Sequence, residues 1–186
     1  DLRMSRGLGD VYKRQVRCLI LDVDGVMTEG GIIYTAAGDE IKVFNSQDGL
    51  GLALARRGGL KLAVITGRYS KMVERRTEEL KFDFVRMACH NKTAAINELA
   101  EELGISTSEM AYMGDDLNDL GALHTVGYPM APANGVAEVK AVAKFIASKL
   151  GGHGAVREAI EHIFKENGRW DELVEDYKNE IYSQGQ

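Results

Sequence analysis

A short aliphatic run over residues 16–21 ends at the motif Asp22-Val23-Asp24-Gly25. A run of this kind, closed by a glycine, is typical of a strand buried on both faces of a parallel sheet. In open sheets of that type, ligands bind just beyond the carboxyl ends of the strands. The glycine lets the chain turn, so that two acidic side chains can converge on one spot instead of pointing to opposite faces. Asp22 and Asp24 are therefore candidate site residues, and the alternative is an ordinary polar turn.

Later apolar runs alternate with helical patterns along the rest of the chain. This alternation predicts an α/β fold with a doubly wound parallel sheet. Two β-rich runs within 31–44, joined by a short turn that contains a glycine, predict a β-hairpin that forms a flap. The expected strands are 16–21, 60–65, 84–87, 110–113, 126–130 and 144–147, and the expected helices are 48–57, 70–80, 93–103, 117–124, 136–141 and 156–164.

The 186 residues suffice for one domain with a full hydrophobic core. Residues 1–15 carry six charges and neither an apolar stretch nor a periodic pattern, so we interpret them as a disordered or non-native extension and not as a signal peptide. Residues 16–186 then form a single domain. Its last part, about 151–186, predicts a helical tail after a glycine-rich loop. Packing of this tail on its own domain and packing on a second subunit are equally compatible with its pattern.

Composition and charge argue against several classes of partner. The formal net charge is −5, so no basic surface indicates nucleic acid or an anionic membrane as a partner. No apolar stretch approaches the roughly 18 residues that a membrane span needs. The only cysteines are Cys18 and Cys89, which indicates reduced thiols in a reducing, cytoplasmic compartment. The four histidines lack the spacing of metal ligands, which argues against zinc.

Polar residues follow several of the expected strands, where the fold brings strand ends together. Carboxylates that face one another repel, and a bound cation removes that repulsion. Oxygen ligands without histidine or cysteine favour a hard ion such as Mg²⁺. A hydroxyl, an ammonium group and such a cation suit a phosphoryl group, because its oxygens need compensating charge. The pattern therefore predicts phosphoryl transfer. The residues are Asp22, Asp24, Thr66, Lys92, Asp115, Asp116 and Asp119.

The order of these motifs distinguishes two architectures that use an aspartyl-phosphate. A response-regulator receiver has an acidic pair first and then Asp, Thr and Lys on later strands. Here the D-x-D motif comes first, followed by Thr66, Lys92 and the acidic cluster 115–119. This order resembles the haloacid dehalogenase superfamily of phosphohydrolases and implies its Rossmann-like fold. Only 41 residues separate Asp24 from Thr66, and 25 separate Thr66 from Lys92, so neither gap holds a cap domain.

The resemblance implies roles for the acidic residues. Asp22 would attack phosphorus and form an aspartyl-phosphate. Asp24 would protonate the leaving oxygen and then deprotonate the water that hydrolyses this intermediate. Mg²⁺ would be held by the Asp22 carboxylate, the Asp24 main-chain carbonyl and the Asp115 carboxylate.

The remaining motif residues would act around the phosphoryl group. Thr66 and Lys92 would hold its oxygens, which places them with the catalytic residues. Asp119 would lie behind the metal ligands and orient Lys92. Asp116 stays open between a water-mediated metal contact and a solvated surface charge.

Within the superfamily, residues 17–186 resemble the capless 3-deoxy-D-manno-octulosonate 8-phosphate phosphatases, which produce a lipopolysaccharide precursor. The resemblance implies a Mg²⁺-dependent enzyme for this sugar acid phosphate. It also implies a homotetramer, in which hairpins pair around a barrel and a tail can close a neighbouring site. The matching stretches are 22–28, 44–45, 48–51, 66–68, 91–92, 114–117 and 151–158.

The same resemblance implies a set of substrate contacts. Arginine suits such a substrate because its planar guanidinium group binds carboxylate and phosphate in bidentate fashion. The chain has Gln47 where many members have arginine, Ala53 where many have a basic residue, and His153 where arginine or lysine is frequent. The expected contacts are Asp24, Asn45, Ser46, Gln47, Asp48, Gly49, Arg68, Arg76 and Lys92.

Three other functions stay open at this point. One is a phosphatase for a nine-carbon keto-deoxy sugar acid phosphate, such as a nonulosonate 9-phosphate. Another is a catalytically silent domain of a sugar-activating system, and the third is a receiver-like switch that keeps its phosphate. Metal-dependent turnover of a phosphate ester that is lost in Asp22→Asn would separate a phosphatase from the last two.

Overall fold

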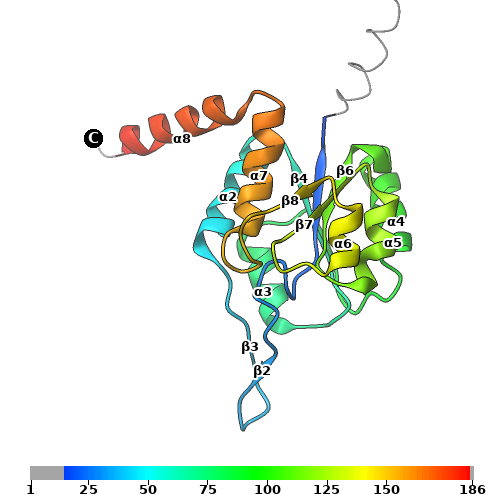
Figure 1. Ribbon diagram of the computed structural model, residues 1–186. Coiled ribbons are helices and arrows are strands. Elements are labelled where there is room, and N and C mark those ends of the chain that lie inside the picture. The colour runs from blue at the N-terminus through cyan, green and yellow to red at the C-terminus, as the bar shows by residue number, and fades with distance from the viewer. Residues whose placement is uncertain (1–14, 185–186) are drawn as a thin grey trace, which may run out of the picture.

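The computed structural model describes residues 15–184 and contains a six-stranded sheet (Figure 1). The extension expected over residues 1–15 lies, except for Gln15, outside the described residues. The strand order is β5-β4-β1-β6-β7-β8, and all neighbouring strands are parallel. The strands are β1 (Cys18–Leu21), β4 (Lys61–Ile65), β5 (Phe84–Arg86), β6 (Met110–Met113), β7 (Tyr128–Ala131) and β8 (Phe145–Ile146).

Helices cover both faces of this sheet, which confirms the predicted doubly wound fold (Figure 1). One face carries α2 (Ser46–Arg57), α3 (Lys71–Glu79) and α7 (Ala155–Glu166). The other carries α4 (Lys92–Leu103), α5 (Leu120–Thr125) and α6 (Ala137–Val142). Among the described residues no cap domain is inserted between these elements, as the short gaps predicted.

The central strand β1 explains why one short apolar run organises the domain. Its side chains alternate between the two faces because successive residues of a strand point in opposite directions. Leu19 and Leu21 enter the core under α2 and α7, and Cys18 and Ile20 enter the core under α4 and α5. The chain moves from β1 outward to β5 on one side and to β8 on the other. The strand order therefore reverses beside β1, where ligands bind in such folds.

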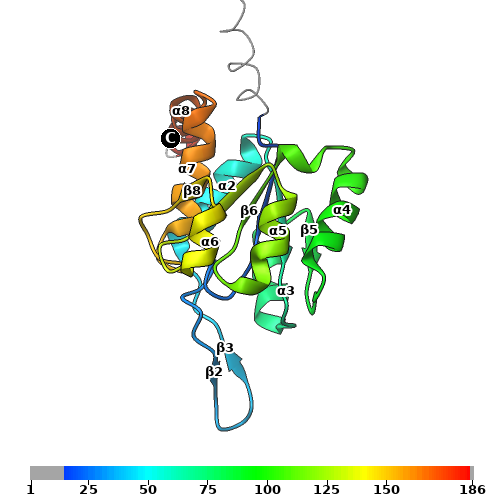
Figure 2. The same ribbon diagram turned by 45° about the vertical axis from the view of Figure 1, so that its right-hand side comes forward.

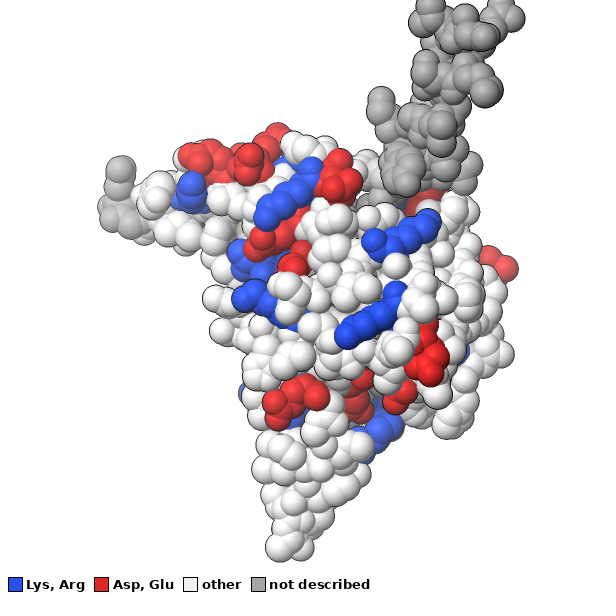
Figure 3. All heavy atoms as spheres, viewed as in Figure 1, with Lys and Arg blue, Asp and Glu red and all other residues white. Residues whose placement is uncertain are grey.

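The predicted hairpin is present and consists of β2 (Ile33–Tyr34) and β3 (Glu40–Ile41), which pair antiparallel. It projects from the edge of the sheet that holds the carboxyl end of β1 (Figures 1 and 2). Its tip shows no charged side chain on the face seen in Figure 3. Several large apolar side chains of the hairpin are exposed, and Val43 reaches 66%.

Two 3-10 turns precede elements of the second half, η1 (Thr107–Glu109) and η2 (Leu117–Asp119). The helix expected over 117–124 begins as η2 and continues as α5, because Asp116 and Asp119 form a capping box that tightens the first turn. The C-terminal helix α8 (Trp170–Gln184) leaves the domain at the end opposite the hairpin (Figure 1). It buries Leu173 but leaves Tyr182 exposed.

The glycine-rich loop 151–154 packs on its own chain, against the turn that follows β1. Gly152 N donates a hydrogen bond to Val26 O over 3.1 Å. A Cβ atom on Gly151 would lie 2.0 Å from Gly25 O, so only glycine permits this approach. The loop therefore packs directly against the backbone of the D-x-D-G turn and supports it.

Asp48 joins α2 to the beginning of α7. Its carboxylate is buried, and Oδ1 accepts a hydrogen bond from Arg157 N over 2.9 Å. Since the residue before α7 is Gly154, which has no side chain to cap the helix, Asp48 caps α7 from another helix. The second oxygen, Oδ2, is buried without a hydrogen-bond partner, and burial raises the pKa of this carboxyl.

This arrangement separates two effects of changing Asp48. Asp48→Ala removes the cap and is expected to lower the free energy of unfolding by about 1–3 kcal/mol. Asp48→Asn keeps an acceptor for Arg157 N and removes a buried charge, so its stability should equal or exceed that of the parent. Urea denaturation of the three proteins measures both. Equal losses in the two variants would contradict the capping role.

Candidate active site

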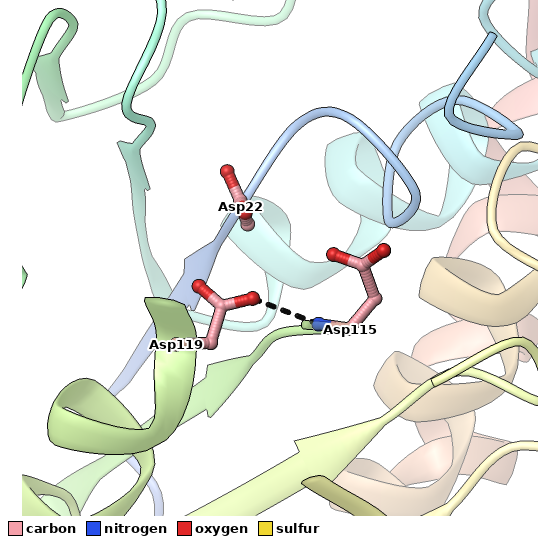
Figure 4. A group of neighbouring side chains, drawn as sticks. All are labelled: Asp22, Asp115 and Asp119. Atoms are coloured by element: carbon pink, nitrogen blue, oxygen red, sulfur yellow. Dashed lines mark hydrogen bonds between the residues drawn. The ribbon is translucent and has the colours of Figure 1, made fainter. Parts of the chain in front are cut away.

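Three carboxylates meet at the carboxyl ends of β1 and β6 (Figure 4). Asp22 follows β1 directly, and Asp115 and Asp119 come from the loop and turn after β6. One oxygen of each lies within 4.8 Å of the others. Asp22 and Asp115 line a cavity of about 240 Å³, and its lining also includes Asp24 and Thr66. The structure thus brings together residues from three strand ends that the sequence predicted to converge.

Lys92 lies between two of these carboxylates. Its Nζ atom is 2.9 Å from Asp22 Oδ2 and 2.7 Å from Asp119 Oδ1, and it also donates to Tyr112 OH over 3.1 Å. Burial alone would lower the pKa of this lysine, but the two carboxylates raise it above its ordinary value. Lys92 is therefore a fixed ammonium ion beside Asp22. It begins α4, whose first turn is capped by Asn91.

Asp119 holds the acidic loop in place and is fully buried. Its Oδ2 accepts hydrogen bonds from Asp115 N and Asp116 N, and its Oδ1 accepts from Lys92 and Tyr112. Since both oxygens already have protein donors, Asp119 is better suited to orient its neighbours than to bind an ion. The 2.7 Å contact between Lys92 and Asp119 is compatible with the orienting role that the resemblance implied, and that role stays a prediction.

The sequence left Asp116 open between a water-mediated metal contact and a solvated surface charge. Its side chain is exposed, and Oδ1 accepts a hydrogen bond from Leu117 N over 2.7 Å at the start of η2. It also lines the rim of the cavity. The geometry therefore gives Asp116 a helix-capping function at the edge of the site.

The charges of the cluster are unbalanced without a bound cation. Burial, and then repulsion from Asp119, raises the pKa of Asp22 to about 6 despite the opposing effect of Lys92. Burial, and then repulsion from Asp22 and Asp119, raises the pKa of Asp115 to about 7. A divalent cation at this position would reverse both shifts, because it stabilises the carboxylate forms.

The residues present fit a magnesium ion. Asp22 and Asp115 offer carboxylate oxygens at one point, and no histidine or cysteine belongs to the cluster among the described residues. A Cβ atom on Gly25 would lie 2.0 Å from Asp115 Oδ2, so the D-x-D-G backbone and Asp115 are in close approach. Hard oxygen donors of this kind are those that Mg²⁺ prefers. Asp22, the Asp24 main-chain carbonyl and Asp115 remain the proposed ligands.

Asp24 makes an ion-pair network with the hairpin. Its Oδ1 lies 2.6 Å from Lys42 Nζ, and its Oδ2 lies 3.6 Å from Arg68 Nη1. Both cations also contact Glu40, at 3.2 and 3.3 Å. The Lys42 side chain is only 2% exposed. The acid–base candidate is thus fixed by Lys42, which lies just after β3, and by Arg68 in the loop after β4.

Thr66 and Arg68 both line the cavity, as expected. Thr66 is buried at the end of β4, where its backbone N–H donates to Arg86 O over 2.9 Å. Arg68 also donates to Tyr34 OH over 2.8 Å, which gives it a second tie to the hairpin.

Other expected substrate contacts lie outside this cavity. Asn45 caps α2 by accepting hydrogen bonds from Gln47 N and Asp48 N. Gly49 sits against Arg76, whose guanidinium stacks on Phe44 with 5.7 Å to the ring centroid. A separate open cavity of about 400 Å³ lies at this surface. Its lining residues include Lys42, Phe44, Ser46, Met72, Arg75 and Arg76.

Sequence reasoning missed Lys42, Glu40 and Tyr112. Glu40 and Lys42 are two residues apart on β3 and its continuation, so they share the face that turns toward Asp24. Their alternation with the exposed Ile41 and Val43 was a signal that could have identified them. Tyr112 had no such signal, because a tyrosine inside a buried strand reads as core.

A D-x-D-G turn on the central strand of a doubly wound sheet, with a buried lysine and an acidic cluster beside it, defines a haloacid dehalogenase-type phosphohydrolase. Residues 87–160 match the family model described as haloacid dehalogenase-like hydrolase. The chain is 38% identical over 157 residues, 84% of each protein, to the 3-deoxy-D-manno-octulosonate 8-phosphate phosphatase of Escherichia coli K12. It is 34% identical to that of Haemophilus influenzae over 83% of this chain and 86% of the relative. The chain belongs to this phosphatase family.

Solved structures agree with this assignment. The phosphatase from Moraxella catarrhalis, in complex with a magnesium ion, a phosphate ion and the sugar acid, superposes with a TM-score of 0.86 at 39% identity, covering 91% of this chain and 99% of that chain. The cobalt-bound phosphatase from Haemophilus influenzae gives a TM-score of 0.82 at 33% identity, covering 86% and 93%. The predicted family, fold and class of enzyme, a phosphoric monoester hydrolase, are confirmed.

The raised pKa values predict how the metal-free protein responds to pH. Both carboxyls titrate above the ordinary value of 3.8, near 6 for Asp22 and near 7 for Asp115, so folding favours their protonated forms. Their destabilising effect is absent below about pH 4 and grows as pH rises to about 7. Asp115→Asn should therefore raise the melting temperature over the parent more at pH 7.5 than at pH 5, with EDTA present. An equal difference at both pH values would contradict this charge imbalance.

Proposed function

We propose that this protein hydrolyses 3-deoxy-D-manno-octulosonate 8-phosphate to the free sugar acid and phosphate with Mg²⁺ as cofactor. The observation that carries the proposal is that Asp22, which contacts Lys92, lines one cavity together with Asp115 and Thr66. The 38% identity to a phosphatase of that name over most of both chains supports the substrate. A reducing, cytoplasmic compartment fits the free thiols of Cys18 and Cys89.

The first chemical step is phosphoryl transfer to Asp22. An oxygen of this carboxylate attacks phosphorus, a P–O bond forms, and the P–O bond to the sugar oxygen breaks. Asp24 delivers a proton to the leaving oxygen, so the sugar acid departs as a neutral alcohol at that position. Lys92 holds Asp22 in place through the 2.9 Å contact and compensates charge on the phosphoryl oxygens.

The second step returns the enzyme to its starting state. A water attacks phosphorus of the aspartyl-phosphate while Asp24 takes its proton, and the bond between phosphorus and Asp22 breaks to release phosphate. Thr66 offers its hydroxyl to a phosphoryl oxygen from the end of β4. When bound by Asp22, the Asp24 carbonyl and Asp115, Mg²⁺ supplies positive charge next to the phosphoryl group.

Arg68 is the proposed contact for the sugar acid inside the cavity. Its guanidinium lies at the rim, between Asp24 and the hairpin, and can bind an anion in bidentate fashion. Ser46 and Arg76 line the second cavity instead, and Asn45 and Gly49 line a small pocket that also reaches Arg76. We therefore propose that these four residues contact the substrate bound to a neighbouring subunit of a homotetramer, whereas the buried Asp48 carboxylate caps α7.

The hairpin supports that assembly. Its exposed apolar residues, among them Ile32 and Val43, form a surface that a second copy of the chain can bury. The partial exposure of α8 is compatible with the tail reaching a neighbour, as the family resemblance implied. Each element would then serve both assembly and the closure of sites that lack a cap.

The activity test uses phosphate release with Mg²⁺ present. The eight-carbon ester should be hydrolysed with kcat/KM at least about tenfold above that of a nine-carbon keto-deoxy sugar acid phosphate. Asp22→Asn should lower kcat by about 10³-fold or more, since the nucleophile is lost. Asp39→Asn in the exposed hairpin turn is the control and should retain parent activity.

Two results would contradict the proposal. Equal rates on unrelated sugar phosphates would remove the substrate assignment. Turnover that persists in Asp22→Asn would remove the proposed mechanism.

Substitutions in the hairpin test the proposed oligomeric state. Ile32→Ser combined with Val43→Ser should shift the mass in light scattering from a tetramer toward smaller species, because it removes apolar area that association buries. Ile146→Ser, at an exposed isoleucine of β8, is the matched control. An unchanged mass in the double variant, or an equal shift in the control, would argue against hairpin-mediated assembly.

A further inference from the structure

Asn134 lies in the connection between β7 and α6 and joins two loops that are far apart in sequence. Its Nδ2 donates a hydrogen bond to Gly25 O over 2.9 Å. Its Oδ1 accepts a hydrogen bond from Gly151 N over 2.7 Å. The amide thereby uses one donor and its acceptor to tie the D-x-D-G turn to the glycine-rich loop. None of the sequence motifs included this residue.

The same connection also holds the second acidic loop. Val136 N donates a hydrogen bond to Asp115 O over 2.9 Å. Gly25 and Asp115 are in close approach, since a Cβ on Gly25 would lie 2.0 Å from Asp115 Oδ2. Residues 134–136 therefore contact the backbone of both loops that carry the proposed metal ligands.

Gly25 is the position in the turn that most needs such support. Its φ of +83° is the left-handed conformation that glycine adopts without strain. A glycine also has more backbone freedom than any other residue, and the carbonyl of Asp24 belongs to the peptide unit directly before it. Val26 N donates to Val23 O, which restrains the far side of the turn. Asn134 restrains the Gly25 carbonyl, so the Asp24 carbonyl is separated from a fixed peptide unit by only the φ and ψ angles of Gly25.

We propose that Asn134 is a positioning residue that sets the direction of the Asp24 main-chain carbonyl toward the metal. The inference rests on the proposed function, because it takes that carbonyl to be a ligand. Asn134 acts through Gly25 and touches neither the metal nor the substrate. Residues that orient metal ligands typically change metal affinity by 10- to 100-fold when they are lost. The expected effect therefore falls on Mg²⁺ affinity more than on the chemical step.

A purely structural role would give a different result, and Lys140 provides the matched control. Lys140 Nζ donates to Ala133 O over 2.5 Å, so it supports the same connection without touching Gly25. Lys140→Met removes this support. Loss of its positive charge would, if anything, favour cation binding. Any weakening of Mg²⁺ binding that is specific to Asn134 variants is then due to the Gly25 contact or to its link with Gly151.

The experiment titrates Mg²⁺ into the full chain by calorimetry, without substrate. Asn134→Ala and the nearly isosteric Asn134→Leu should each bind Mg²⁺ about tenfold more weakly than the parent. Both should need about tenfold more Mg²⁺ for half-maximal phosphate release and recover most of kcat at saturation. Lys140→Met should stay within twofold of the parent in Mg²⁺ affinity, even if its melting temperature falls as far as those of the Asn134 variants.

Mg²⁺ affinities within twofold of the parent in both Asn134 variants would overturn the proposal and leave Asn134 as a tie between loops. An equal loss of affinity in Lys140→Met would overturn it as well. Failure of the proposed function would give a different result from failure of the Asn134 proposal. In that case the parent binds Mg²⁺, the Asn134 variants bind it more weakly, and no protein hydrolyses the eight-carbon ester.

Discussion

The arrangement of the site depends on one buried ammonium ion among several carboxylates. Lys92 contacts Asp22 and Asp119 and is itself almost fully buried. One positive charge does not balance Asp22, Asp115 and Asp119, and the raised pKa values of Asp22 and Asp115 express that deficit. This deficit favours the binding of a further cation. A phosphoryl group brings more negative charge to the same point, so the deficit grows when substrate binds.

Glycines set how closely the loops of the site approach one another. Gly25 lies against Asp115, Gly114 lies against Asp119, and Gly151 lies against Gly25. In each case a Cβ atom would fall 2.0–2.5 Å from its neighbour, a distance that no side chain tolerates. The acidic cluster is therefore compact because backbone replaces side chain at these contacts. Hydrogen bonds from Asn134 and Val136 then fix the directions of the Gly25 and Asp115 main-chain carbonyls, respectively.

Sequence periodicity predicted the parts of the structure that depend on local pattern. The aliphatic run of β1 and the motifs at strand ends predicted the parallel sheet and the convergence of Asp22, Lys92 and Asp115. Contacts between loops could not be predicted in this way, because they depend on backbone paths far apart in the chain. Asp48 is the clearest case: its motif implied substrate contact, while the fold places its carboxylate on Arg157 N. Asn134 carries no motif, and only the structure brings it to Gly25.

Lys42 connects the hairpin to the catalytic turn through its ion pair with Asp24. Along β3 and its continuation, Glu40 and Lys42 face Asp24, while Ile41 and Val43 face outward. The two faces of a strand share one backbone, so a contact that fixes the outer side chains also fixes the inner ones. A flexible hairpin would move Lys42 relative to Asp24, whereas burial of Ile41 and Val43 against another surface would hold it. In a fold without a cap domain, the position of Asp24 therefore depends on what packs against the far side of the hairpin.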